Sequence, residues 1–431
     1  MKTLDQIAAE LAGYDPQALS ADSVTDFLRR MIEPVRETET VGIFHALGRI
    51  LAADVISPVD VPPHDNSAMD GFAFDGAQLS DTHASILKIV GTAYAGKAWR
   101  GDLQPGECVK IMTGAVMPDG LDTVAPQELV TVQGQHVTLP ANRLRLGDNR
   151  RAKGEDIRLG QAALQKGQTL TPAVLGLVAS LGLQEVLVWR QLTVAYFSTG
   201  DEILSLGEAP REGAVYDSNR YTVFGLLTRL GIKMIDMGVV RDEPALLEAA
   251  FKQAASQADV IITSGGVSVG EADHTRAMMQ QLAGSAGGVA FWRIAMRPGR
   301  PMAVGRIAKP GAGGETVLFG LPGNPVAVMV TFLAFVRPAL LQMMGCTTEA
   351  PPYLKAISSE AIRKKPGRTE YQRGIVTTAP DRSLLVRSTG NQGSGVLSSM
   401  TQANGLIVLH HGQANVAAGE LVDVMMFDGA I

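Results

Sequence analysis

The stretch LTVAYFSTGDE, residues 192–202, opens the part of the chain that decides the fold. Its apolar half has the length and the β-branched and aromatic residues of a buried strand, and a polar turn ends it. The same order of strand, turn and helix recurs downstream, with strands expected at 232–240, 259–264, 290–295 and 316–320 and helices at 218–230, 244–257, 274–282 and 325–344. Strands that alternate with helices of this length predict an α/β domain with a doubly wound parallel sheet.

The segment SGGVSVGEAD, residues 264–273, follows one of these strands and precedes a helix. It therefore lies at the carboxyl end of a parallel strand, where open α/β sheets usually bind ligands. Glycines and serines let backbone N–H groups approach an anion closely, and the next helix adds a favourable dipole. The expected cradle consists of Ser264, Gly265, Gly266, Ser268 and Gly270. The alternative is an ordinary glycine turn with Asp273 as a helix cap.

Acidic residues also follow the neighbouring strands. Glu202 comes after the first strand, Asp242 after the second, and Glu271 and Asp273 after the third. Parallel strands end at one edge of a sheet, so we expect these carboxylates to converge. Carboxylates around an anion cradle suit a divalent cation that bridges them to a phosphate-bearing ligand. Each loop taken alone is better explained as a helix entry.

A further strand-to-helix junction, LPGNP, offers Pro322, Gly323 and Asn324. Just before it, Arg293, Arg297 and Arg300 stand in a segment bounded by Gly and Pro. Arginine binds phosphate and other oxyanions through two parallel N–H groups, so these residues are candidate anion ligands. A helix cap and a solvated charged hairpin are the structural alternatives.

The first half of the chain reads differently. Short β-like segments separated by Gly, Pro and Asp turns occupy residues 86–139 and predict a small β-rich domain. Asp70 in DNSAMDGFA and Thr113 in MTG are its candidate site residues, with a plain turn as the alternative for each. Residues 142–158 form a basic bridge that contains Arg151 and Asp156 and reads either as an anion clamp or as a solvated face.

Composition excludes several functions. The 431 residues include 38 Lys and Arg against 43 Asp and Glu, a formal net charge of −5, and no basic group is interleaved with aromatics. Broad nucleic-acid binding is therefore not expected. The two cysteines are far apart and the seven histidines show no ligand spacing, which argues against disulfide frameworks and zinc sites. No secretory signal and no membrane span is recognised, so we expect a cytoplasmic protein without a membrane partner.

One rival hypothesis comes from Gly266-Val-Ser268-Val-Gly270, which formally matches the GxSxG pattern of a serine hydrolase. In such an elbow the helix begins directly after the serine, whereas five residues intervene here. A triad would also have to recruit His410 or His411 from beyond a Pro-Pro boundary. This class is therefore the weaker interpretation.

Taken together, the motifs resemble the molybdopterin molybdenumtransferases, to which the C-terminal catalytic region of gephyrin is similar. The resemblance extends over about residues 20–425. The motifs occur in the order found in that family: PPHDNSAMDGFAF, KIMTGAVMPDGLDTV, RRAKGEDI, FSTGDEI, YDSNR, TSGGVSVGEADHT, MRPGRPMAVG, LPGNPVAVMVTF and GNQGSGVLSSMTQANGLI.

The resemblance implies four domains. These are an elongated linking domain (36–64 and 146–185), a small β-rich domain (65–145), an α/β molybdopterin-binding domain (1–35 and 190–345) and a C-terminal β barrel (350–431). It further implies a homodimer with active sites between protomers and transient contact with other proteins of molybdenum cofactor synthesis. The implied reaction takes molybdate and adenylylated molybdopterin, releases AMP by hydrolysis and leaves molybdenum on the dithiolene, with Mg²⁺ assisting.

The resemblance also assigns roles to the candidate residues. Asp70, Thr113, Glu202, Asp242 and Asp273 are the expected catalytic residues, and Asp242, Asp273 and Glu271 the expected metal ligands. The ligand-binding set is Ser264, Gly265, Gly266, Ser268, Gly270, Arg151, Asp156, Arg293, Arg297, Arg300, Pro322, Gly323 and Asn324.

One departure concerns the arginines. The family commonly carries lysine where this chain has Arg293, Arg297 and Arg300. Arginine keeps the charge but does not readily give up a proton. The alternatives are therefore a non-catalytic molybdopterin-binding carrier, or a paralogue with an altered oxyanion preference such as tungstate.

Overall fold

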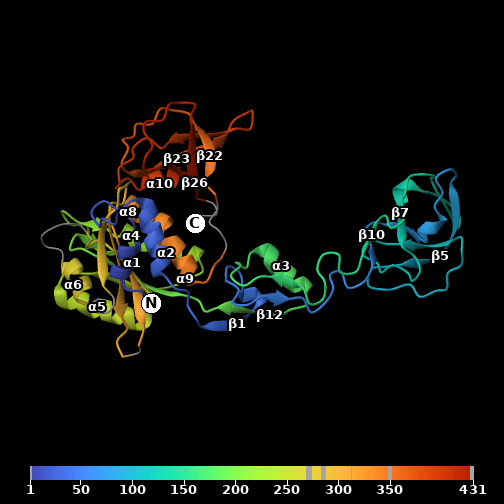
Figure 1. Ribbon diagram of the computed structural model, residues 1–431, viewed down its shortest axis with the longest axis horizontal. Helices are drawn as coiled ribbons and strands as arrows, with labels where there is room; N and C mark the ends of the chain where they lie inside the picture. Colours follow the sequence, from blue (N-terminus) through green and yellow to red (C-terminus); the bar gives the residue numbers. More distant parts are fainter. Residues whose placement is uncertain (1, 268–273, 283–287, 312, 348–351, 428–431) are drawn as a thin grey trace.

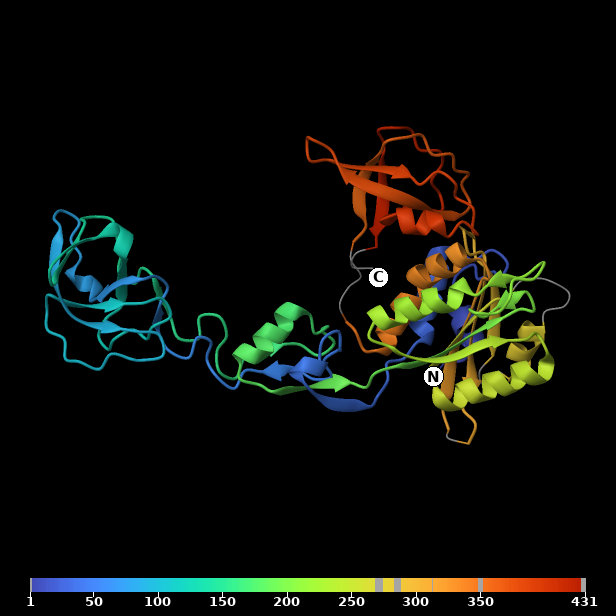
Figure 2. The ribbon, with the colours of Figure 1, turned by 180° about the vertical axis from the view of Figure 1, so that it is seen from behind.

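The computed structural model describes residues 2–267, 274–282, 288–311, 313–347 and 352–427. Figure 1 shows an elongated molecule: an α/β body with a β barrel above it, a slender middle region, and a small β body at the far end. Figure 2 shows the same separation from behind, so the small β body stands clear of the α/β body in both views.

The α/β body is built on a six-stranded sheet in the order β16-β13-β17-β21-β20-β18. The four strands from β16 to β21 are parallel, while β20 and β18 pair antiparallel. The expected fold class is thus confirmed, with the correction that the sheet is mixed. The bounds are β13 Thr193–Thr199, β16 Lys233–Val240, β17 Val260–Ser264, β18 Val289–Arg293, β20 Pro301–Ala308 and β21 Glu315–Leu321.

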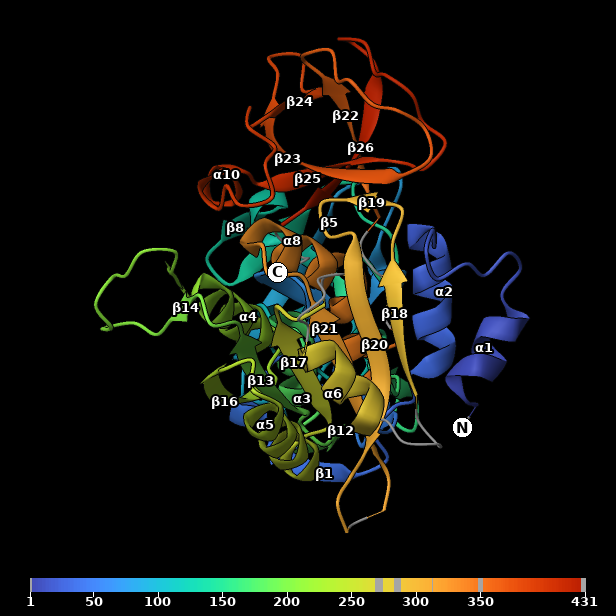
Figure 3. The ribbon, with the colours of Figure 1, turned by 90° about the vertical axis from the view of Figure 1, so that its left-hand side faces the viewer.

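Alternate residues of the central strand β13 face opposite layers of helices. Val194 and Tyr196 pack in the core beneath α1, α2, α4, α8 and α9, whereas Ala195 and Phe197 pack against α5 and α6. Figure 3 shows α5 and α6 on one side of the sheet. The helices are α1 Leu4–Glu10, α2 Ala21–Met31, α4 Ser218–Arg229, α5 Pro244–Gln257, α6 His274–Leu282, α8 Pro325–Thr331 and α9 Arg337–Met343.

The expected long helix at 325–344 is interrupted by a π-helical turn, η4 Phe332–Val336. Its 19-residue span Pro325–Met343 is apolar and long enough to cross a membrane by length and composition, but 67% of it is buried inside the molecule. It is therefore explained as a core helix, because Val326, Val330 and Phe335 pack in the main core.

The middle region and the small β body hold the first half of the chain. The middle region contains α3 Pro172–Ser180, η1 Ile43–His45 and the pairs β1 Thr38–Gly42 with β12 Glu185–Trp189 and β2 Val55–Ile56 with β11 Ala162–Leu164. A short ladder, β3 Asn66–Ser67 with β10 Arg150–Arg151, borders the small body. The small body's sheet comprises β7 Thr123–Pro126, β4 Gly71–Phe74, β6 Glu107–Ile111, β5 Ser85–Ala93, β9 His136–Leu139 and β8 Thr131–Gln133, with η2 Gly76–Gln78 and η3 Gln127–Leu129.

The C-terminal region forms a closed barrel, because β23 pairs with both β24 and β25. A two-residue strand of the α/β body, β19 Met296–Arg297, pairs with β23 and joins the barrel to the α/β body. The barrel elements are β22 Leu354–Ser358, β23 Thr369–Thr378, β24 Leu384–Ser388, α10 Ser398–Gln402, β25 Gly405–Leu409 and β26 Leu421–Met426.

A core substitution in the α5–α6 layer tests this packing. Phe251 is fully buried and its ring meets Phe197 edge to face at 5.0 Å. Phe251→Ala should cost about 3–5 kcal/mol of stability through lost apolar contact and a residual cavity. Phe224→Ala on α4, where the ring is 53% exposed, is the matched control. Equal thermal denaturation midpoints for the two variants would contradict the packing described here.

Candidate functional site

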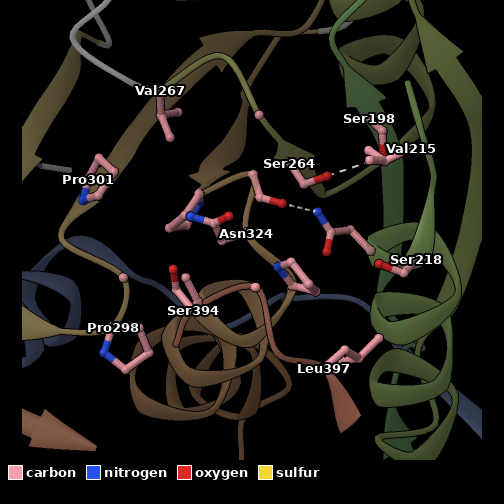
Figure 4. Close-up of a pocket in the computed structure, with 18 of the residues that line it drawn as sticks. Ser198, Val215, Ser218, Ser264, Val267, Pro298, Pro301, Asn324, Ser394 and Leu397 are labelled. Atoms are coloured by element: carbon pink, nitrogen blue, oxygen red, sulfur yellow. Dashed lines mark hydrogen bonds between the residues drawn. The ribbon is translucent and has the colours of Figure 1, made fainter. Parts of the chain in front are cut away.

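A cleft of about 1120 Å³ lies where the strands of the α/β sheet end and the barrel meets them. Its walls come from the ends of β13, β17 and β21, the paired strands β14 Ile203–Leu204 and β15 Val215–Tyr216, the starts of α4 and α8, the loop 296–301, and the barrel. Figure 4 shows part of this lining. The predicted residues that line it are Glu202, Ser264, Gly265, Gly266, Arg297, Arg300, Pro322, Gly323 and Asn324.

The turn after β17 needs glycine for steric reasons. A Cβ on Gly265 would lie 2.4 Å from the Thr199 carbonyl oxygen, and Gly265 has φ +90°. A Cβ on Gly266 would lie 2.4 Å from the Cβ of Thr275 on α6. The N–H of Gly265 donates to the Leu321 carbonyl at 3.1 Å. Gly265 therefore shapes the turn rather than offering its own N–H to an anion.

A cluster of three hydroxyls underlies this turn. The Tyr196 hydroxyl lies 2.9 Å from Ser198 Oγ and 2.7 Å from Ser264 Oγ, and the two serine oxygens are 3.2 Å apart. Burial raises the pKa of Tyr196, so its hydroxyl stays protonated. Ser198 and Ser264 both line the cleft, and Figure 4 shows them facing each other. Tyr196 and Ser198 escaped the sequence analysis because they stand inside an apolar strand.

The loop between β18 and β20 supplies the positive charge. Arg297 and Arg300 are exposed, line the cleft and have no ion-pair partner among the described residues. Arg293 differs from them: it lies on β18, outside the cleft lining, and its backbone N–H donates to Pro16. The structure thus brings two of the three predicted arginines to the cleft.

The barrel contributes residues that the sequence analysis did not select. Arg368, Gln392 and Ser394 line the cleft, and Arg368 is paired with Glu370 at 2.7 Å. The buried Arg373 donates to the carbonyls of Asn391 and Gly393, which holds the 391–394 loop against the cleft. The GNQGSG motif was the available signal, but nothing in the sequence placed it beside a different domain.

The start of α4 was also missed as part of the site. Asp217, Ser218 and Asn219, within the YDSNR motif, line the cleft. The Asn219 side-chain amide donates to the Gly323 carbonyl at 2.7 Å and so ties α4 to the LPGNP loop.

Only some of the predicted acidic residues are found at the cleft. Glu202 lines the cleft, whereas Asp242 lies outside the lining and accepts a hydrogen bond from the Thr275 hydroxyl at 3.1 Å. Glu271 and Asp273, and with them Ser268 and Gly270, lie outside the described residues. Within the described part of the chain no group of three His, Cys, Asp or Glu side chains could hold a metal ion. The described residues therefore do not by themselves form a magnesium site.

Asp70 and Thr113 lie together in the small β body. Asp70 Oδ1 accepts from the backbone N–H and from the hydroxyl of Thr113, both at 2.7 Å. These bonds, the backbone one first, hold the pKa of the exposed Asp70 below its ordinary value. Arg151, on β10 at the border of this body, and the nearby Asp156 are exposed as well. Figures 1 and 2 show that this body is remote from the α/β body of the same chain.

Comparison with known proteins agrees with this architecture. Residues 19–182 match the MoeA N-terminal region (domain I and II), residues 195–342 a probable molybdopterin binding domain, and residues 355–427 the MoeA C-terminal region (domain IV). The chain thus has the MoeA domain architecture, with a probable molybdopterin binding domain between the two MoeA regions.

Individual relatives are similar over nearly their full lengths. A molybdopterin molybdenumtransferase of Haemophilus influenzae is 41% identical, covering 91% of this chain and 94% of that protein. One of Nostoc is 34% identical, covering 91% and 90%. The crystal structure of the molybdopterin biosynthesis moeA protein of Pyrococcus horikoshii has a TM-score of 0.78 at 25% identity, covering 95% of this chain and all of that one.

This chain belongs to the molybdopterin molybdenumtransferase family, a family of transferases in molybdenum cofactor biosynthesis. The resemblance seen in the motifs and the enzyme class are confirmed. The serine-hydrolase hypothesis has no support among these relatives.

The bonds to Asp70 predict a pH effect. In Thr113→Val the backbone bond remains but the hydroxyl bond is lost, so the pKa of Asp70 should rise toward its ordinary value. Any activity that needs the ionised carboxylate would then be lost at a higher pH as the solution is acidified. Carboxyl NMR titration measures the shift, with Thr131→Val in the same body as the control. An unchanged Asp70 pKa would contradict this account.

The turn after β17 predicts a steric effect. Gly265→Ala should distort the turn because its Cβ meets the Thr199 carbonyl, and inorganic phosphate should bind at least about tenfold more weakly once the cradle is displaced. Gly48→Ala is the control, since Gly48 has φ +75° with nothing within 4 Å of a Cβ. Calorimetric titration with phosphate compares them, and equal affinities would refute the role of the turn.

Proposed function

We propose that this protein inserts molybdenum from molybdate into adenylylated molybdopterin, with hydrolytic release of AMP. The observation that supports the proposal most directly is the cleft itself. It combines a glycine turn and hydroxyls at parallel strand ends with two arginines that form no ion pair within the described residues, a lining suited to a ligand with phosphate groups and to an oxyanion.

The positions of the residues suggest a division of roles. Arg297 and Arg300 offer guanidinium groups to molybdate or to phosphate oxygens. The turn at Ser264–Gly266 and the cleft-lining Asn324 hold the phosphate-bearing part of the substrate. Among the expected catalytic residues that the structure describes, Glu202 lines the cleft. We assign to its carboxylate the role of orienting the attacking water.

The hydrolytic step balances as follows. Water adds to the phosphorus of the AMP group, the bond from that phosphorus to the bridging oxygen on molybdopterin breaks, and AMP and a proton leave. The two dithiolene thiols then form two bonds to molybdenum, their two protons leave with one molybdate oxygen as water, and the oxidation state of molybdenum does not change. We propose Mg²⁺ as an assisting ion with Asp242, Asp273 and Glu271 as its ligands, but the steps above do not depend on it.

Asp70 requires a second copy of the chain. It is an expected catalytic residue, yet its body stands apart from the α/β body of the same chain (Figure 1). We therefore propose a homodimer in which Asp70, Thr113, Arg151 and Asp156 of one protomer approach the cleft of the other. Transient contact with other proteins of the same biosynthesis and a cytoplasmic location remain part of the proposal.

AMP release tests the function. Purified protein with adenylylated molybdopterin should release AMP only when molybdate is present, and molybdenum should remain on the pterin. The assay is run with and without Mg²⁺, and with tungstate in place of molybdate. Binding without release would favour the carrier, and faster turnover with tungstate would favour the paralogue with altered oxyanion preference.

Asp70→Asn tests the assigned carboxylate. The amide can still accept the Thr113 bonds, so folding should be retained, while molybdate-dependent AMP release should fall by at least about 100-fold if the carboxylate takes part in proton transfer. Asp81→Asn, in an exposed turn of the same body, is the matched control. Near-normal turnover by the Asp70 variant would remove it from the catalytic set.

A further inference from the structure

The cleft has two sides of different chemistry. In Figure 4, Val215 and Ser218 lie on one side and Pro298 and Pro301 on the other, with Asn324 and Ser394 between them. The second side carries Arg297 and Arg300, which form no ion pair in the part of the chain that the structure describes. The first side, at the start of α4, carries instead buried oxygen atoms that have no hydrogen-bond partner among the described residues.

Asp217 is the first of these residues. It caps α4, and its Oδ1 accepts from the Arg220 backbone N–H at 3.1 Å. The residue is only 3% exposed, and its Oδ2 is buried with no hydrogen-bond partner in the described part of the chain. A buried carboxylate oxygen without a donor is costly, so this atom is left for a group that the protein does not supply.

Asn219 is the second residue with a buried oxygen of this kind. Its Nδ2 donates to the Gly323 carbonyl, which fixes the amide, because the reverse orientation would set two oxygens against each other. The residue is 7% exposed, and its Oδ1 has no partner among the residues described. Thr199, at the end of β13, is 3% exposed, and its hydroxyl is likewise unpartnered within the described structure. All three residues line the cleft.

The competing explanation is a partner within the protein. Arg220 is the positive charge nearest in sequence, and its Nε is also unpartnered in the described chain. Its terminal nitrogen, however, pairs with Asp236 on β16. Asp217 thus has no ion-pair partner among the described residues, and an exchange of Arg220 from Asp236 to Asp217 can be tested directly.

We infer that Asp217 and Asn219 form a subsite for the N–H edge of an amino-substituted planar heterocycle. A carboxylate and an amide oxygen accept well from an exocyclic amino group and an adjacent ring N–H. In the proposed substrate the aminopyrimidinone edge of the pterin offers both the amino group and the adjacent ring N–H, whereas adenine offers only the two hydrogens of its 6-amino group, because the ring nitrogens beside that group are acceptors. The inference rests on the proposed function and deepens it by orienting the substrate in the cleft.

The charges on the two sides of the cleft set the orientation of the substrate. A carboxylate at the α4 side disfavours phosphate there, while Arg297 and Arg300 favour it on the opposite side. The ring carrying the amino group therefore lies against α4 and the anionic groups lie toward the arginines. The Asp217 and Asn219 side chains recognise the ring, and neither takes part in the bond changes.

The test uses binding in the absence of turnover. The full chain is titrated calorimetrically with AMP, with 2-amino-4-oxopteridine and with inorganic phosphate. Asp217→Asn should weaken binding of at least one ring ligand by about 10- to 100-fold, the range expected for a lost hydrogen bond to a charged group, and should leave phosphate affinity unchanged. If Asp217→Asn weakens the binding of AMP alone, adenine is the occupant. If it weakens the binding of the pteridine alone, the pterin is the occupant.

Asp236→Asn is the matched control, because it makes the same change on the other carboxylate beside Arg220 and lies outside the cleft lining. It should leave all three affinities unchanged. Equal ring binding by wild type and Asp217→Asn would overturn the inference, and so would equal losses in both variants. Asparagine and serine both cap helices well, so Asp217→Ser serves if Asp217→Asn does not fold.

The two proposals can fail separately. If wild type binds a ring ligand and Asp217→Asn does not, but no AMP is released from adenylylated molybdopterin, the subsite stands and the proposed reaction falls. If AMP is released and Asp217→Asn binds both ring ligands normally, only the subsite falls. If wild type binds neither ring ligand, the subsite is refuted whatever the turnover.

Discussion

The site depends on one constraint, which is that parallel strands end at the same edge of a sheet. β13, β17 and β21 are paired in register from Val194 alongside Val260 and Val317 onward, so their carboxyl ends emerge together. The loops that follow them must share the same space, and only glycine fits where Gly265 passes the Thr199 carbonyl. The cleft, its hydroxyl cluster and its contact with α4 all follow from that shared edge.

The alternation of strands and helices was readable from the sequence because periodicity and turn residues report local structure. The antiparallel part of the sheet was not predicted, because no strand was expected at 301–308, where β20 lies and pairs with β21. Ser20 caps α2 by accepting a hydrogen bond from the Ser23 N–H, although other side chains in the same stretch are of equally good capping types. Differences of this kind between prediction and structure leave the fold class unchanged.

Local motifs predicted the glycine turn and the two arginines, whereas long-range placement was not predictable from them. Arg293 stands in the same segment as Arg297, yet the strand β18 carries it away from the cleft. Ser394 reaches the cleft from a separate domain, and Asp70 lies in a body at the far end of the molecule. Spacing along a chain does not encode these distances, because they are set by how domains pack.

The joint between barrel and α/β body has a mechanical consequence. The ladder between them is two residues long, Met296 with Thr369 and Arg297 with Glu370, although Val326 also donates to the Ser394 carbonyl. Buried side chains of the barrel, Tyr371, Met400, Leu406 and Val408, also belong to the main core and hold the two bodies together. A ligand that contacts both the α/β wall and the barrel wall binds only when the two bodies are together. By mass action its binding free energy therefore stabilises their association. Ligand binding in the cleft and the association of the barrel with the α/β body are thus linked equilibria, and each favours the other.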